Sequence, residues 1–151
     1  MEKQLDIMRQ PRLTILKTLE EFTLDQLNTI PVGFNNNIIW NLGHMVATLQ
    51  KVCYLKAGLD DMVEETFYKR YESGSKPEAP ANEQEYELIK TLFMTSLDKL
   101  GEDYKAGIFG NYPEWTTRYG ASISNIDEAL AFLPFHEGLH IGYVMAMRKL
   151  V

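Results

Sequence analysis

The stretch that decides the fold is the last part of the chain, Ser124–Val151, which reads SNIDEALAFLPFHEGLHIGYVMAMRKLV. Ser124 and Asp127 have the spacing of a capping box, so we expect an α-helix to begin there. The positions that follow the helical period of three and four residues are apolar residues and two histidines: Ile126, Leu130, Leu133, His136, His140, Val144 and Met147. This stretch therefore predicts an amphipathic helix with one face turned toward a core.

Three other stretches have the same period, and none shows sustained strand alternation. They predict helices over Glu2–Phe22, from the asparagine run 35–37 to Ala57, and over Asn82–Tyr104, with a short helical turn over Leu24–Asn28. Pro11 is expected to kink the first helix or to mark its first turn. Long connections separate the second helix from the third and the third from the fourth. The fold class predicted is all-α, a four-helix bundle in a single domain, residues 1–151.

Composition and charge exclude several classes of protein. The chain has 15 basic and 21 acidic residues, a net charge of −6, and no clustered basic surface, which argues against nucleic acid as a partner. The uncharged stretch Val32–Gln50 contains four asparagines, so it predicts no membrane span. Cys53 is the single cysteine and suits a reducing compartment. We expect a cytoplasmic protein.

The three histidines are the candidate site. His136 and His140 are four residues apart, so their side chains leave the same face of the last helix, and that face is the apolar one. His44 lies beside the apolar seam of the second helix, and an antiparallel pairing of the two helices would bring all three to similar depth. Three neutral imidazoles suit a divalent metal ion, zinc or nickel, and leave a coordination position open. The alternative is that each histidine is a hydrogen-bonded core residue.

Glu137 is the candidate catalytic residue. His136–His140 reads HEGLH and matches the H-E-x-x-H pattern, in which the glutamate acts as general base beside the metal. No histidine, aspartate or glutamate follows His140 to serve as the third ligand that such metalloproteases recruit. Glu137 is therefore expected either to orient or deprotonate water bound to the metal, or to be a solvated helix residue.

Two motifs carry a resemblance to a known family. Asn37–Met45 reads NIIWNLGHM and His136–Gly142 reads HEGLHIG, which correspond to a W-x-x-x-H element on the second helix and H-x-x-x-H on the fourth. The chain resembles the DinB-like (DinB/YfiT-like) superfamily of metal-binding four-helix bundles over nearly its whole length. The resemblance implies an up-down-down-up course with a long crossover between helices 2 and 3, frequent homodimers, and His44, His136 and His140 as metal ligands.

The resemblance also suggests an activity. Characterised members include transferases and isomerases that use low-molecular-weight thiols such as bacillithiol or mycothiol. This implies a small-molecule substrate and a thiol cosubstrate, with Cys53 expected to be a core residue. Two alternatives stay open: a metal-dependent hydrolase, and a non-catalytic dimeric accessory protein. The aromatic loop Tyr112–Trp115 with Arg118 is expected to cover the end of the bundle or to line a pocket, and Gly138 and Gly142 to permit close helix approach.

Overall fold

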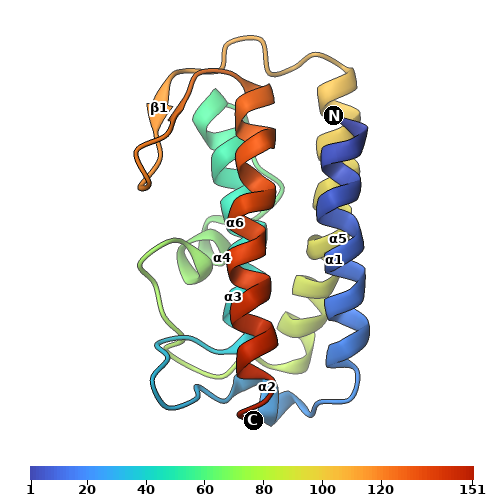
Figure 1. The fold of residues 1–151 in the computed structure, drawn as a ribbon, viewed down its shortest axis with the longest axis vertical. Helices are drawn as coiled ribbons and strands as arrows, with labels where there is room; N and C mark the ends of the chain where they lie inside the picture. Colours follow the sequence, from blue (N-terminus) through green and yellow to red (C-terminus); the bar gives the residue numbers. More distant parts are fainter.

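The computed structural model describes residues 1–151 and is mainly helical (Figure 1). The long helices are α1 (Glu2–Leu19), α3 (Ile38–Leu49), α5 (Glu83–Lys105) and α6 (Ile126–Met147). The shorter elements are α2 (Leu24–Asn28), a π-helical turn (Gln50–Tyr54), a 3₁₀ turn (Leu55–Ala57), α4 (Glu65–Tyr71) and the antiparallel strands β1 (Trp115–Thr116) and β2 (Ser122–Ile123). The predicted all-helical class is confirmed.

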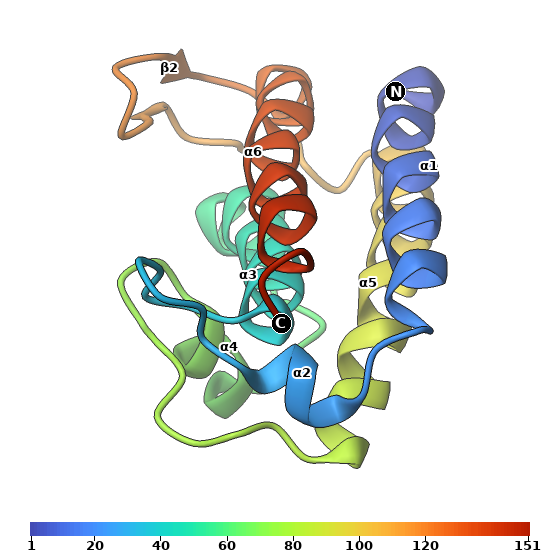
Figure 2. The same cartoon turned by 60° about the horizontal axis from the view of Figure 1, so that its bottom comes forward.

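The four long helices pack so that α1 and α3 each contact both α5 and α6. In Figure 1, α1 and α6 run downward while α3 and α5 run upward, so the neighbours α3 and α6 are antiparallel. Because α3 and α5 run the same way, the chain between them returns along the molecule, and α4 lies in this connection against α3 (Figure 2). The helix α3 is covered by α4, α5 and α6. Thr48 is its only residue that is not buried.

Asparagine side chains cap three of the long helices. The side chain of Asn37 accepts the Trp40 N–H at 2.7 Å, Asn82 caps α5 in the same way, and Asn125 caps α6. The capping box predicted from Ser124 is wrong by one residue. Ser124 lies just outside the helix, where its hydroxyl and N–H donate to the Glu128 carboxylate, because the next residue is an equally good cap.

Several elements differ from the sequence-based expectation. α1 continues through Pro11 without interruption and ends at Leu19, three residues before the predicted end. Proline removes one helical hydrogen bond, and the carbonyl that loses it belongs to Ile7, an exposed residue, so the helix tolerates the loss. The helix α4 and the hairpin of β1 and β2 were not predicted, since both are too short to give a periodic signal.

The face of α6 that points away from the other helices is apolar. Phe135, Leu139, Tyr143 and Met145 are exposed on it. Gly138 and Gly142 lie on the exposed side too, and no atom lies within 4 Å of the place a Cβ would take at either. The predicted role of these glycines in close helix approach is therefore wrong within this chain. No helix combines the length and the apolar character needed to cross a membrane.

Candidate metal centre

The position of His44 is set by three neighbours. Trp40, one turn earlier on α3, stacks on the imidazole with ring centroids 4.6 Å apart and planes 9° from parallel. Gly43 lets α4 approach closely, because a Cβ there would lie 2.5 Å from the Tyr71 ring. The backbone carbonyl of Tyr71 consequently reaches His44 and accepts a 2.7 Å hydrogen bond from Nδ1. A carbonyl only accepts, so Nδ1 carries the proton and the lone pair of His44 lies on Nε2.

His140 is oriented across the interface between α3 and α6. Its Nδ1 lies 2.8 Å from the side-chain oxygen of Asn41. The Asn41 amide cannot turn around freely, since its nitrogen donates to the Asn37 carbonyl at 2.8 Å. His140 therefore donates from Nδ1 and keeps its lone pair on Nε2. A histidine held in this way by an outer amide or carbonyl is the usual arrangement of a metal ligand.

The structure brings the three predicted histidines to one point. One potential ligand atom from each of His44, His136 and His140 lies within 4.8 Å of the other two. The ring centroids are 4.6 Å apart for His44–His140 and His136–His140, and 5.3 Å apart for His44–His136. Two helices that are distant in sequence thus converge their imidazoles, as the spacing predicted.

All three imidazoles are held neutral. Burial lowers the pKa of His136 to about 3 and that of His140 to about 3, with neighbouring histidines and Arg118 adding to the effect. Burial also lowers the pKa of His44, against the opposing effect of its hydrogen bond to the Tyr71 carbonyl. Neutral imidazole is the form that binds a metal ion, so no proton has to be displaced at neutral pH.

His136 provides the test of whether these residues fit a metal ion. Its Nδ1 is buried without a hydrogen-bond partner, and its ring makes no hydrogen bond at all. A buried polar nitrogen without a partner costs free energy, typically about 1–3 kcal/mol. A divalent ion that took this nitrogen of His136 as its third ligand would offset that cost. Three nitrogen ligands with no carboxylate suit zinc or nickel, and the fit is good.

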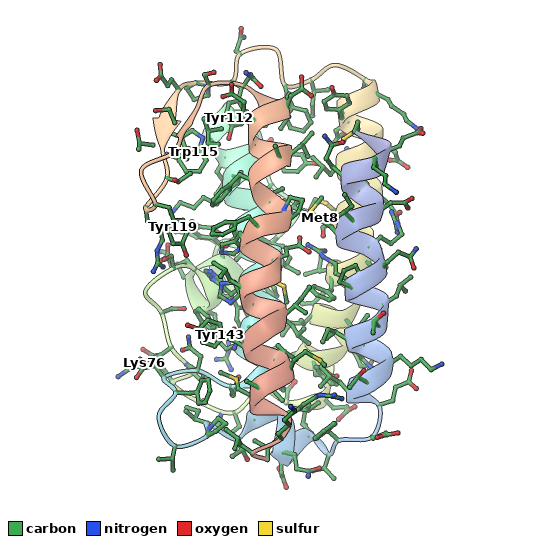
Figure 3. The ribbon with its side chains drawn as sticks, viewed as in Figure 1. Met8, Lys76, Tyr112, Trp115, Tyr119 and Tyr143 are labelled. Carbon is green, nitrogen blue, oxygen red and sulfur yellow. The ribbon has the colours of Figure 1, made fainter.

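A cavity of about 530 Å³ opens beside the histidines. His44 and His140 lie in its wall together with Trp40, Asn41, Tyr143 and Met147, and the remaining lining comes from three loops: Gly33–Asn36, Ser73–Lys76 and Arg118. Figure 3 shows Tyr143 and Lys76 on this side of the molecule, with Tyr119 of the β1–β2 turn above them. A small molecule entering the cavity would therefore reach His44 and His140, whereas His136 does not line it.

Glu137 does not join this cluster. Both of its carboxylate oxygens bind Arg12 of α1, with Nε at 3.0 Å and an Nη at 2.5 Å, and both side chains are buried. Successive helix residues point about 100° apart, so a residue next to His136 faces α1 and α5 when His136 faces α3. Neither predicted environment for Glu137, beside the ion or in solvent, describes it: the carboxylate is buried and saturated by Arg12.

The aromatic loop was expected either to cover the end of the bundle or to line a pocket, and different residues of it do each. The Tyr112 hydroxyl donates to the Val52 carbonyl at 2.6 Å and accepts from the Trp115 indole at 2.9 Å, so these residues cover the π-helical turn that follows α3. Arg118, from the same loop, lines the cavity instead. Cys53 is fully buried, as expected of a core residue, and burial raises the pKa of its thiol.

Sequence reasoning missed the residues that orient the imidazoles. Asn41 sits one turn before Met45 in a helix and carries no local signal beyond being a polar residue in an apolar seam. Tyr71 contributes a backbone carbonyl, which no sequence pattern can identify. Gly43 was the one available hint, since glycine inside a buried helix often marks close approach of another element.

Together, the helical fold and the three-histidine cluster beside a cavity define a helical protein with a candidate metal centre. The sequence profile of the DinB superfamily matches residues 7–144, and the chain belongs to that superfamily. No curated protein matches the chain.

Proposed function

We propose that the chain is a divalent-metal-dependent enzyme whose ion is bound by His44, His136 and His140, and that it transfers a low-molecular-weight thiol to an electrophilic small molecule. The observation that carries this proposal is the convergence of three neutral imidazoles, one of them with a buried nitrogen that has no partner and the other two in the wall of a cavity. Zinc and nickel are the ions that best suit an all-imidazole ligand set.

The chain's own residues would bind the ion and orient its histidine ligands. Three protein ligands leave a position open, and a divalent ion there lowers the pKa of a thiol that enters it. The Asn41 amide and the Tyr71 carbonyl bind Nδ1 of His140 and His44, which leaves Nε2 of each ring as the possible ligand atom. The Thr48 hydroxyl lies 3.3 Å from Nε2 of His44 and would give way to an ion there. Trp40 stacks on His44 and keeps its ring plane in place. Because the thiol comes from a cosubstrate, the buried Cys53 has no part in the reaction.

Two other functions were open from the sequence. A hydrolase that uses Glu137 as general base is not favoured, since Arg12 binds both carboxylate oxygens. If the chain is a non-catalytic accessory protein instead, the purified protein is expected to contain no tightly bound metal. Turnover of thiols with electrophiles, compared with turnover of a panel of esters and amides, separates the transferase from the hydrolase.

We propose that the long helices form the up-down-down-up bundle with a crossover between α3 and α5, which their contacts and directions support.

We propose a homodimer through the outer face of α6, where Phe135, Leu139 and Met145 are exposed. Light scattering at several protein concentrations tests whether the chain dimerises. A cytoplasmic location stays a prediction.

The metal content of purified protein tests the proposed function. Protein prepared without chelator or a nickel affinity step is expected to contain close to one equivalent of zinc or nickel by elemental analysis. The variants His44→Ala and His140→Ala should lose most of it while keeping their helical circular dichroism. Cys53→Ala is the matched control, because it removes a potential metal ligand that lies outside the cluster. Stoichiometric metal in both histidine variants would remove the ligand assignment.

A further inference from the structure

The cavity beside the histidines carries positive charge that no protein group neutralises. Its lining contains Lys76 and Arg118 but no aspartate or glutamate. Every ion pair of the chain involves other residues, and neither side chain makes a hydrogen bond. In a protein of net charge −6, two unpaired basic side chains on one cavity are a local reversal of the overall charge. Such a reversal attracts an anion.

The backbone that carries Lys76 is held in place. The hydroxyl of the preceding residue, Ser75, donates to the Arg70 and Glu72 carbonyls at 2.8 and 2.9 Å and accepts from the Trp40 indole at 3.0 Å. The loop is therefore tied to the same tryptophan that stacks on His44. Lys76 itself extends from this fixed point with an exposed side chain (Figure 3).

Arg118 also stands on a fixed backbone. It occupies the turn between β1 and β2, which is closed by hydrogen bonds from the Thr117 N–H to the Ala121 carbonyl at 2.8 Å and from the Gly120 N–H to the Thr117 carbonyl at 3.0 Å. The neighbouring Tyr119 packs edge-on against Phe135 of α6, with ring centroids 5.2 Å apart. The turn is thus docked on the helix that carries His136 and His140.

We propose that Lys76 and Arg118 bind an oxyanion group, a carboxylate, sulfonate or phosphate, on the thiol whose sulfur uses the three-histidine site. This inference rests on the proposed function and names the chemical class of its cosubstrate. The guanidinium of Arg118 offers paired N–H donors that match two oxygens of such a group, and Lys76 adds a second charge. The imidazoles contribute no negative charge, so a divalent ion would add to the attraction. The cavity of about 530 Å³ can hold both ends of one small molecule.

The test compares thiols that differ only in the anion. Binding of mercaptopropionate and mercaptopropanol, and of mercaptoethanesulfonate and mercaptoethanol, is measured by calorimetry on the zinc-loaded protein at low salt. Arg118→Gln should weaken binding of the anionic member of each pair about tenfold, and Lys76→Gln about threefold, with the neutral member unchanged. Lys3→Gln is the matched control, since it removes the same charge from an exposed residue outside the cavity. Equal effects on both members of each pair, or none, overturn the proposal.

A second arm separates this proposal from the metal site. Inorganic phosphate and succinate are titrated into metal-free protein, and the Arg118 side-chain N–H resonance is followed by NMR. A saturable shift that Lys76→Gln weakens supports the oxyanion site even if no metal binds, in which case the proposed function alone fails. If zinc binds but neither anion shifts this resonance and the anionic thiols have no advantage, the oxyanion site alone fails. Preference among sulfonate, carboxylate and phosphate identifies the group.

Discussion

α6 carries two buried polar centres on adjacent faces, and they differ in how completely they are satisfied. On one face, Glu137 binds Arg12 through both oxygens, and Arg12 directs its remaining nitrogen to the Phe93 carbonyl and the Ser96 hydroxyl. On the other face, His136 has no hydrogen bond, and His140 borders a cavity. The first centre is closed by protein, and the second has unused binding capacity.

The difference between the two centres separates a structural role from a ligand-binding one. A buried charge whose every hydrogen bond is made by protein joins helices, here α1, α5 and α6. A buried nitrogen that no protein group satisfies, beside two histidines that line a cavity, is available to a ligand. Removing a residue from the first centre should therefore change stability, and removing one from the second should change metal binding.

The largest expected effect is on the closed centre. Glu137→Ala leaves the Arg12 guanidinium buried without a counter-ion, and we expect it to lower the free energy of unfolding by about 3–5 kcal/mol. Urea unfolding followed by circular dichroism measures the loss. Replacing both residues, as Arg12→Met with Glu137→Met, should recover much of it, because no unpaired charge remains. A stability loss below about 1 kcal/mol in Glu137→Ala contradicts the assignment of this pair to structure.

The next effect concerns the open centre. Asn41→Ala removes the acceptor that orients His140, and we expect zinc affinity to fall about 10- to 100-fold while the helical fold is kept. Competition with a zinc chelator measures the affinity. Asn41→Asp keeps an acceptor oxygen for His140 but loses the donor to the Asn37 carbonyl, so it should retain more of the affinity than Asn41→Ala. Equal affinities for Asn41→Ala and the wild type would mean that His140 is not oriented through Asn41.

A third effect is the pH dependence of the metal-free protein. The pKa of His136 and of His140 is about 3 in the folded chain, against 6.5 for an ordinary histidine. Between these values the unfolded chain binds more protons, so stability is fully present above pH 6.5 and falls as the pH drops toward 3, by about 1.4 kcal/mol per unit for each histidine. Chemical unfolding at several pH values should show this slope, and His140→Ala should show a smaller one. Equal slopes would place the acid sensitivity elsewhere.

The smallest expected effect is a control for the other three. Asn82→Ala removes the cap of α5, far along the chain from both centres, and should lower the free energy of unfolding by about 1 kcal/mol. Zinc affinity should stay at the wild-type value, which a chelator competition confirms. A large loss of zinc affinity in this variant would show that affinity follows general stability, and the contrast between the two centres would then carry no information.

Much of this molecule could be predicted from its sequence, and the exceptions have physical reasons. The i, i+4 spacing of His136 and His140 predicts their shared face, and the asparagines before α3 and α5 predict those helix starts. The motif around Glu137, by contrast, suggested a catalytic base. Its partner Arg12 lies 125 residues away, and no local pattern connects them. The contributions of the Tyr71 carbonyl and of the turn at Arg118 could not be predicted for the same reason, since both reach the site through packing of distant segments.

X-ray absorption spectroscopy on the zinc-loaded protein tests the central claim most directly, because it identifies the atoms bound to the ion. Three imidazole nitrogens at about 2.0–2.1 Å, with one further light-atom ligand that a bound thiol replaces by sulfur, are the predicted result. The same spectrum recorded on His136→Ala should show the loss of one imidazole. A first coordination shell without imidazole, or with sulfur before any thiol is added, would contradict binding by His44, His136 and His140.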